Sequence, residues 1–365
     1  MPASWWTSCA ASAGARDEEG SCLIRILLVD DSPSVRAVLR RFFSRTRDIK
    51  VAGEAADGAQ ALQAVIDLQP DVVVMDLQMP VMDGYQATEQ IMATRPTPIV
   101  VLSSRANRNQ MQTAFEAMRR GALEVLPKPE DTASWQQLAD SLPETVRTVA
   151  KAQTAPRAQR QRAVRAEVLA SDPLELRWVA IGASTGGPAA IREFLEEVPA
   201  DPPVGFLIVQ HIASGFELGF ADWLNKEFPF DVRLAQDGEV LRRGAVRLAP
   251  GGSHLRMEAD GVLRLDSETP ARKGHRPSVD EMFLSCAAHC PREVAGVLMT
   301  GMGADGVEGL LALRRAGGFT LVQDEASSVV FGMPRVALEK GAAEIALPPK
   351  DLARTLVRLW KKGER

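Results

Sequence analysis

Short apolar runs alternate with amphipathic segments along the first part of this chain. Five of these runs are rich in Val, Ile and Leu, as buried strands usually are: 24–30, 51–55, 71–76, 98–104 and 124–128. Between them, segments such as 34–46 and 58–69 carry apolar residues at the spacing of one helix face. This alternation predicts an α/β domain with a five-stranded, doubly wound parallel sheet.

The same alternation returns after residue 176. Four more apolar runs have the character of strands followed by helices: 177–184, 205–212, 294–301 and 318–325. Between the second and third of them, residues 231–266 form short alternating runs broken by Gly and Asp, which favours antiparallel hairpins. We therefore expect a second, larger doubly wound α/β domain with an antiparallel hairpin insertion.

These patterns divide the chain into four parts. Residues 1–22 lack the basic start and continuous apolar core of a secretory signal, so we expect a disordered tail. The first domain is expected over 23–145 and the second over 176–350. Between them, 146–175 is mostly polar and basic, with no interleaved aromatic residues, which favours a solvated linker. A fifth helix is expected over 132–152, with Pro143 kinking or breaking it.

Composition narrows the class of protein. The 365 residues are 45% hydrophobic and 25% charged, with a net charge of −4, which argues against a nucleic-acid binder. No apolar stretch approaches the roughly 20 residues of a membrane span. The four scattered cysteines suit a reducing cytoplasm better than a disulfide framework. Cys286, His289 and Cys290 are too few for a structural zinc site, so a buried helix face is favoured there.

Polar residues follow the strands of the first domain. Asp30 and Asp31 follow the first strand and Asp76 the third, while Ser103 and Ser104 follow the fourth and Lys128 the fifth. Ligands gather at the carboxyl ends of parallel strands, so these side chains are expected to converge. Three close carboxylates repel one another unless a hard cation such as Mg²⁺ neutralises them. Beside that metal, one carboxylate can accept a phosphoryl group, with a hydroxyl and a lysine stabilising it.

The stretches "LLVDDSPSVR", "VVVMDLQMPVMDG" and "VLPKP" closely resemble the receiver domain of bacterial response regulators, over about residues 24–145. The resemblance implies that Asp76 is phosphorylated and that Asp30 and Asp31 bind Mg²⁺ with it. It also implies that Ser103 stands in the place of the switch Thr/Ser and that Lys128 contacts the phosphoryl group. Val125 stands near the position where many receivers carry an aromatic switch residue, so the pattern departs from the family there.

The second domain offers a nucleophile. "AIGASTGGP" places Ser184 in a Gly-flanked turn between a strand and a helix, as in G-x-S-x-G elbows, although such turns also bind phosphate. A nucleophilic serine needs a base, and His211 at the end of the next strand is the best placed of the four histidines. Asp305, in a loop after a later strand, would orient that histidine. The order Ser, His, Asp does not imply the α/β-hydrolase fold.

The loop "TGMGADG" at 300–306 has a second interpretation. It satisfies G-x-G-x-x-G, and Asp324 and Glu325 follow at the distance of a ribose-binding carboxylate, which is the pattern of a dinucleotide site. The strand before it comes late in its domain, however, and Asp305 would place a negative charge against a pyrophosphate. Spacing alone leaves this alternative open.

"AIGASTGGP", "VQHI", "RPSVD" and "LMTGMGADG" together resemble the catalytic domain of the protein-glutamate methylesterases of bacterial chemotaxis, over about 176–348. The resemblance implies Ser184 as nucleophile, His211 as general base and Asp305 as its orienter. It also implies the backbone N–H of Met302 as an oxyanion donor, with Thr185 close by. "GHRPSVDEMF" adds Arg276, Ser278 and Asp280 as weaker candidates near the substrate; a helix start capped by Ser278 or Asp280 explains that segment equally well.

The function implied is hydrolysis of glutamate γ-methyl esters, and of certain glutamine amides, on the cytoplasmic region of chemoreceptors. The resemblance implies no cofactor for this reaction, Mg²⁺ only in the receiver, and a histidine kinase as phosphodonor. Because the two domains share one chain through a linker, we hypothesise that phosphorylation relieves occlusion of the active site by the receiver. The alternative is a response regulator whose second domain only binds a partner or nucleotide. A DNA-binding regulator is disfavoured, because the chain has no evident recognition helix.

Overall fold

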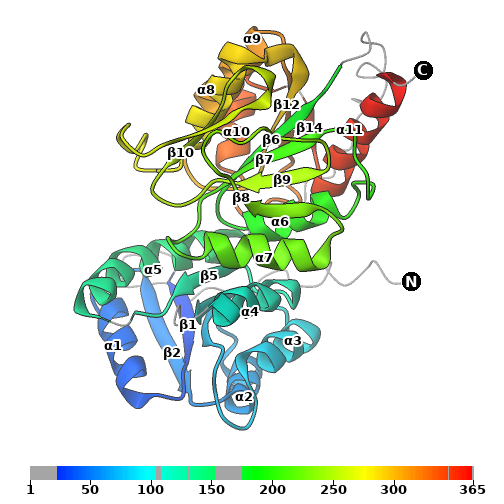
Figure 1. Cartoon of the computed structure of the whole chain (residues 1–365). Coiled ribbons are helices and arrows are strands. Elements are labelled where there is room, and N and C mark those ends of the chain that lie inside the picture. Colours follow the sequence, from blue (N-terminus) through cyan, green and yellow to red (C-terminus); the bar gives the residue numbers. More distant parts are fainter. Residues whose placement is uncertain (1–22, 104–107, 130, 153–174, 344, 364–365) are drawn as a thin grey trace. The chain divides into compact units, whose positions relative to one another are not determined.

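The computed structural model describes residues 23–103, 108–129, 131–152, 175–343 and 345–363. The chain divides into two compact units, and each of its two large parallel sheets is described here with its own helices (Figure 1). The expected tail at 1–22 and most of the expected linker, 153–174, lie outside the described residues. No helix in the described ranges is long and apolar enough to cross a bilayer.

The N-terminal sheet has the strand order β2-β1-β3-β4-β5, which confirms the predicted five-stranded α/β domain. Its strands are β1 (Ile24–Val29), β2 (Ile49–Ala55), β3 (Val72–Asp76), β4 (Ile99–Ser103) and β5 (Glu124–Pro127). Its helices are α1 (Pro33–Phe43), α2 (Gly58–Leu68), α3 (Gly84–Thr94), α4 (Arg108–Arg119) and α5 (Thr132–Ala152). Pro143 lies inside α5 without ending it, and the domain boundary expected at 145 also falls within this helix.

The second sheet has seven strands in the order β14-β13-β12-β6-β7-β9-β8, all in parallel pairs. The strands are β6 (Trp178–Ala183), β7 (Gly205–Gln210), β8 (Asp231–Leu234), β9 (Ala245–Leu248), β12 (Val294–Leu298), β13 (Phe319–Gln323) and β14 (Ile345–Leu347). The helices are α6 (Gly187–Leu195), α7 (Glu217–Glu227), α8 (Val279–His289), α9 (Val307–Arg315), α10 (Met333–Glu339) and α11 (Pro349–Gly363). The boundary expected at 350 falls at the start of α11.

The segment 231–266 only partly follows its prediction. β10 (His254–Met257) and β11 (Leu263–Asp266) form an antiparallel hairpin, as expected, but as a separate two-stranded sheet. β8 and β9 instead pair in parallel and extend the main sheet. Residues 235–244 carry the chain back before β9 begins, so both strands run in one direction. Short alternating runs are shared by parallel edge strands and hairpins, and the pattern could not separate them.

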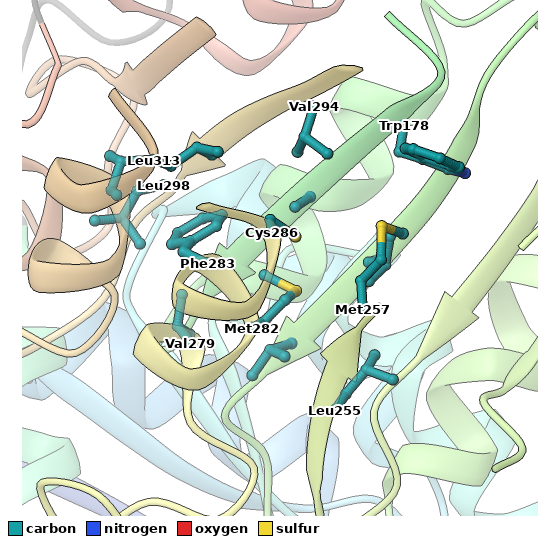
Figure 2. Close-up of a cluster of buried hydrophobic side chains, with 14 of the residues drawn as sticks. Trp178, Leu255, Met257, Val279, Met282, Phe283, Cys286, Val294, Leu298 and Leu313 are labelled. Atoms are coloured by element: carbon teal, nitrogen blue, oxygen red, sulfur yellow. The ribbon is translucent and has the colours of Figure 1, made fainter. Parts of the chain in front are cut away.

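Helices cover both faces of the seven-stranded sheet because its strands are apolar on both faces. On one face, Leu207 and Val209 of β7 join a buried cluster with Phe283 of α8 and Leu313 of α9 (Figure 2). On the other, Phe206 of β7 lies with its ring centroid 6.5 Å from Phe194 of α6 and 6.2 Å from Trp360 of α11. Cys286 of α8 and Cys290, which follows the end of this helix, are both buried, as the helix-face interpretation predicts.

Candidate functional site

Ser184 lies at the carboxyl end of β6, in the turn before α6. Its N–H donates to the carbonyl of Thr300, at 3.0 Å, and the N–H of His211 donates to the carbonyl of Ala183, at 2.9 Å. Because β6 is paired with β12 on one side and β7 on the other, these contacts bring Ser184, His211 and the 300–306 loop to the same edge of the sheet.

The 300–306 loop packs its backbone directly against Ser184. A Cβ added to Gly301 would lie 2.7 Å from the Cβ of Ser184, a separation that real side chains do not tolerate. Gly306, at φ 85°, makes the left-handed turn into α9. The glycines of this loop therefore allow a close approach between two loops and a tight turn into a helix.

His211 and Asp305 form a buried pair. The Nε2 atom of His211 lies 2.9 Å from Oδ2 of Asp305, with side chains 9% and 2% exposed. Next to an ionised carboxylate, Nε2 carries the proton, so Nδ1 holds the lone pair. That Nδ1 atom is buried and has no hydrogen-bond partner among the described residues. The pair thus leaves one basic nitrogen of His211 available at the sheet edge that also carries Ser184.

The amino end of α8 holds the Asp305 carboxylate. The hydroxyl of Ser278 donates to Oδ1 at 2.8 Å, the N–H of Val279 to Oδ2 at 2.7 Å and the N–H of Asp280 to Oδ1 at 3.1 Å. Burial alone would raise the pKa of Asp305. The hydrogen bonds from His211, Ser278 and Val279 outweigh burial and hold that pKa well below its usual value. Asp305 is therefore a fixed negative charge beside the imidazole.

His275 stacks on His211. The two ring centroids lie 3.8 Å apart and the planes are 6° from parallel. Burial, followed by the neighbouring His211, lowers the pKa of His275, which favours its neutral form. Both rings line a cavity of about 190 Å³, together with Glu217 and Arg276. The sequence did not single out His275, because nothing in the spacing of two distant loops indicates a stacked pair.

Gln210 also belongs to this site, and it was not predicted. Its Nε2 atom donates to the carbonyls of both Ser184 and His211, at 2.8 Å each, and the side chain is 6% exposed. An added Cβ on Gly187 would lie 1.9 Å from its Oε1, so the glycine is required for this placement. Gln210 joins the two turns that carry Ser184 and His211. The only available signal was its position next to His211.

The weaker candidates take different positions. Arg276 is exposed and lines the cavity, and Met302, 50% exposed, follows Gly301. Thr185 is half-buried, and its carbonyl accepts a hydrogen bond from the Thr300 hydroxyl. Ser278 and Asp280 are both 0% exposed. Ser278 is indeed the N-cap of α8, accepting from Glu281, yet the same hydroxyl also bonds Asp305.

A second group of functional side chains lies in the N-terminal sheet. Ligand oxygens of Asp30, Asp31 and Asp76 lie within 4.8 Å of one another, with Asp30 and Asp76 buried and Asp31 exposed. Paired strands bring them together, because Asp30 follows β1 and Asp76 ends β3. Three adjacent hard oxygen donors fit the preference of Mg²⁺, which would also offset their mutual repulsion.

The remaining receiver candidates follow β4 and β5. Ser103, 5% exposed, ends β4 next to the residue paired with Asp76, and its carbonyl accepts the N–H of Lys128 at 2.7 Å. Ser104 lies outside the described residues. Val125 is buried in β5, where its aliphatic side chain packs.

Two family descriptions match the chain: CheB methylesterase over residues 179–356 and response regulator receiver domain over 26–140. A protein-glutamate methylesterase/protein-glutamine glutaminase 3 of Anaeromyxobacter dehalogenans is 42% identical over 341 residues, covering 93% of this chain and 99% of the relative. The chain belongs to this methylesterase/glutaminase family.

The chain is also similar to a further curated relative and to a solved structure. A protein-glutamate methylesterase/protein-glutamine glutaminase of Symbiobacterium thermophilum is 38% identical over 356 residues, covering 93% of this chain and 98% of the relative. Among solved structures, the CheB methylesterase catalytic domain of Thermotoga maritima is 33% identical, with a TM-score of 0.49, and covers 50% of this chain and 98% of that chain.

Membership of the methylesterase/glutaminase family disfavours the dinucleotide interpretation of the 300–306 loop, and the local contacts agree. Asp324, the proposed ribose ligand, accepts the N–H of Ser327 at 3.1 Å and its hydroxyl at 2.5 Å, so it caps a turn. Asp305 turns its carboxylate to α8 and His211. The loop therefore uses its carboxylate within the protein.

Proposed function

We propose that this chain hydrolyses glutamate γ-methyl esters on chemoreceptors, and the amide of certain glutamines, with Ser184 as nucleophile, His211 as general base and Asp305 as its orienter. One observation carries the proposal. The buried 2.9 Å contact between His211 Nε2 and Asp305 fixes the proton on Nε2, and it leaves Nδ1 as the basic atom. In the usual Ser-His-Asp template the two ring nitrogens have the opposite roles.

The reaction follows from these assignments. Nδ1 of His211 takes the hydroxyl proton of Ser184 as Oγ attacks the ester carbonyl carbon, giving a tetrahedral oxyanion. The backbone N–H of Met302 is the proposed donor to that oxyanion. Collapse breaks the bond to the methoxy group, which leaves as methanol with the proton from Nδ1. Water then attacks the acyl-enzyme while Nδ1 takes one of its protons, and Ser184 recovers that proton as the bond to Oγ breaks. The product leaves as a glutamic acid side chain, which releases its remaining proton to solvent.

Asp305 contributes to each proton transfer without gaining a proton. Its negative charge stabilises the imidazolium that forms on His211 in both steps. Three donors from the start of α8 hold the carboxylate in place, so little reorganisation accompanies the change in charge. A glutamine amide follows the same route, with ammonia as the leaving group.

We further propose that phosphorylation of Asp76 by a histidine kinase regulates this hydrolysis. Asp30, Asp31 and Asp76 would hold Mg²⁺, which neutralises charge on the phosphoryl oxygens when it is bound. Ser103 and Lys128 would contact the added phosphoryl group. The presence of a receiver and a methylesterase in one chain supports this assignment.

Methanol release from methylated receptor membranes tests both parts. We expect Ser184→Ala and His211→Gln to reduce the rate at least a thousandfold, while Ser141→Ala, at an exposed serine of α5, keeps the wild-type rate. A small phosphodonor with Mg²⁺ should change the rate of the wild type and leave Asp76→Asn unchanged. Full activity in Ser184→Ala would contradict the proposed nucleophile. A wild type insensitive to the phosphodonor would contradict the regulation.

A further inference from the structure

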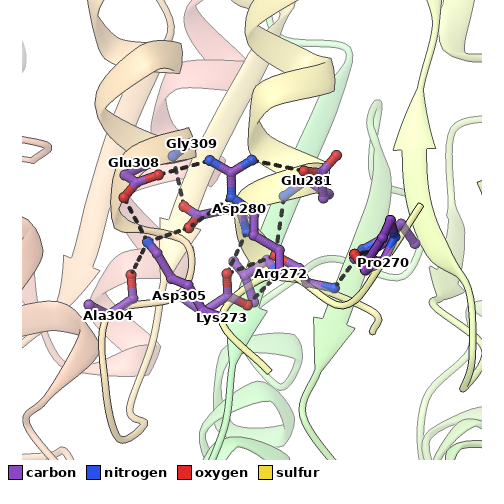
Figure 3. A network of polar contacts seen from close by, with 12 residues as sticks. Pro270, Arg272, Lys273, Asp280, Glu281, Ala304, Asp305, Glu308 and Gly309 are labelled. Atoms are coloured by element: carbon purple, nitrogen blue, oxygen red, sulfur yellow. Dashed lines mark hydrogen bonds and ion pairs between the residues drawn. The ribbon is translucent and has the colours of Figure 1, made fainter. Parts of the chain in front are cut away.

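Asp280 is a buried carboxylate that the proposed reaction does not use. It is 0% exposed, so it contacts no substrate directly. Its Oδ1 accepts the N–H of Gly309, in the first turn of α9, at 2.8 Å, and its Oδ2 lies 2.7 Å from the ammonium of Lys273 (Figure 3). Burying a charged carboxylate costs free energy, and these two partners offset that cost.

Asp280 and Asp305 connect α8 and α9 in opposite directions. Asp305 lies in the loop just before Gly306, the N-cap of α9, and accepts hydrogen bonds from the amino end of α8. Asp280 lies in the first turn of α8 and accepts a hydrogen bond from the first turn of α9. Each carboxylate thus lies at the positive end of the other helix. The two helices pack closely here, since a Cβ on Gly309 would lie 2.6 Å from the carbonyl oxygen of Asp280.

Lys273 is the cation of this arrangement. Its ammonium contacts Asp280, donates to the carbonyl of Ala304 at 3.2 Å and lies 3.1 Å from Glu308, so it joins α8, the 300–306 loop and α9 (Figure 3). Its backbone has φ 50°, a left-handed conformation that a lysine adopts at some cost. That cost is consistent with a position fixed by its contacts.

The surroundings of Asp280 act on its pKa in opposite directions. Burial raises the pKa of Asp280, the Gly309 N–H and Lys273 lower it, and the negative charge of Asp305 raises it again. Two neighbouring carboxylates would share a proton without a nearby cation. Lys273 is the cation in direct contact, and Arg272 lies farther away, with its Nε 3.7 Å from Asp280.

We propose that Lys273 and Asp280 are positioning residues for the hydrolysis: their ion pair holds the Asp305 loop against α8 and sets the net charge that the His211 imidazole meets. This inference rests on the proposed function. Neither residue touches substrate. Both act on Asp305, and through it on the basicity of His211.

Several other charged or titratable groups surround His211 and Asp305 and contribute to the electrostatic field there. Those on the elements packed around His211 and Asp305 are Glu217, His254, Arg272, His275, Arg276, Glu281 and Glu308. Glu308 offers a matched control, because it contacts Lys273 and Arg272 but is 49% exposed, so solvent screens its charge.

The test is the pH dependence of kcat/KM for ester hydrolysis by the full chain without a phosphodonor, since its acid limb reports the base of the free enzyme. Asp280→Asn removes a negative charge, so the limb should move to lower pH by about half a unit. Lys273→Met removes a positive charge and should move it to higher pH. That shift should be smaller, because Asp280 then takes up part of the proton. The double variant should return close to the wild-type limb.

Two further variants and a comparison of kcat with KM separate the effect of charge from an effect on folding. Lys273→Arg keeps the cation and should keep the wild-type limb, and Glu308→Gln should move it by less than either single change. Both single changes should lower kcat about threefold to tenfold with little change in KM, because the substrate site is intact. The proposal would be overturned if the acid limbs of Asp280→Asn and Lys273→Met moved in the same direction, or if both stayed in place. A Ser184→Ala variant with full activity would instead overturn the proposed function.

Discussion

Replacing Ser278 by alanine tests whether the Ser278 hydroxyl holds the Asp305 carboxylate in place. The hydroxyl is fully buried, donates to Oδ1 of Asp305 at 2.8 Å and accepts the N–H of Glu281 at 3.4 Å as the cap of α8. Alanine removes both contacts and fills nearly the same space. The expected result is a loss of stability and of activity together.

The magnitude follows from the two contacts. Loss of a serine cap costs about 1 kcal/mol, and loss of a hydrogen bond to a charged group costs about 1.5–3 kcal/mol. The cap bond here is long, and Asp305 keeps its two backbone donors, so we expect about 2–3 kcal/mol in total. For a unit of this size that is a fall in Tm of roughly 5–10 °C. A less firmly held Asp305 should lower kcat/KM by about tenfold.

The contribution of Asp305 to stability depends on pH. Hydrogen bonds hold the pKa of Asp305 below its usual value, so this group stabilises the fold at every pH above about 3.9, the value expected in the unfolded chain. That contribution is lost as pH falls from about 3.9 towards the depressed pKa. Ser278→Ala moves the folded-state pKa of Asp305 back towards its usual value, so the difference in stability between wild type and variant should be constant above about 3.9 and should narrow only as pH falls below that value.

Thermal melts from pH 7 to pH 2, with kinetics at pH 7, provide the measurement. Thr269→Val is the matched control, because that hydroxyl also donates to an aspartate, Asp266, at 2.6 Å, but away from His211. It should lose some stability and keep the wild-type kcat/KM. The reasoning would be refuted if Ser278→Ala matched this control in kcat/KM, or if its deficit in Tm did not depend on pH.

Three other substitutions follow from local geometry. Val81→Gly should raise the free energy of unfolding by about 0.5–1 kcal/mol in a denaturant titration, because Val81 is 88% exposed at φ 67°; a decrease would contradict this. Gly301→Ala should lower kcat at least tenfold, because its Cβ would lie 2.7 Å from that of Ser184, and a wild-type kcat would contradict this. His275→Phe should flatten the loss of stability between pH 7 and 5. The pKa of His275 is lowered in the fold, so the unfolded chain takes up the proton first below about 6.5, and an unchanged slope would count against this.

Much of the fold could be predicted because both sheets are parallel and buried on two faces. Continuous apolar runs such as β3 and β7 have few other interpretations in a soluble chain. The same reasoning failed for β8 and β9, whose short runs at the sheet edge fit a hairpin equally well. Pro143 was expected to kink or break a helix, and the break does not occur, since α5 continues through it. The predictions that rested on strongly buried strands were confirmed, whereas the prediction for β8 and β9, which rested on a short local pattern, was wrong.

The candidate site, too, was predicted only in part. Ser184, His211 and the Asp305 loop follow adjacent parallel strands, so strand order alone brings them to one edge, although their catalytic roles stay predictions. His275, Gln210 and Lys273 could not be found in this way, because their positions depend on rotamers and on loops that leave the sheet.

Asp305 explains why those additional residues are needed. An aspartate that is 2% exposed can stay ionised only if donors and cations replace the water that it has lost. One helix end supplies the donors, but the same helix brings Asp280 into the centre, and this second buried charge must be neutralised in turn. Lys273 does so from a loop that neither helix contains. The ion pair therefore follows from burying the first carboxylate, which is why its removal should be detected at His211.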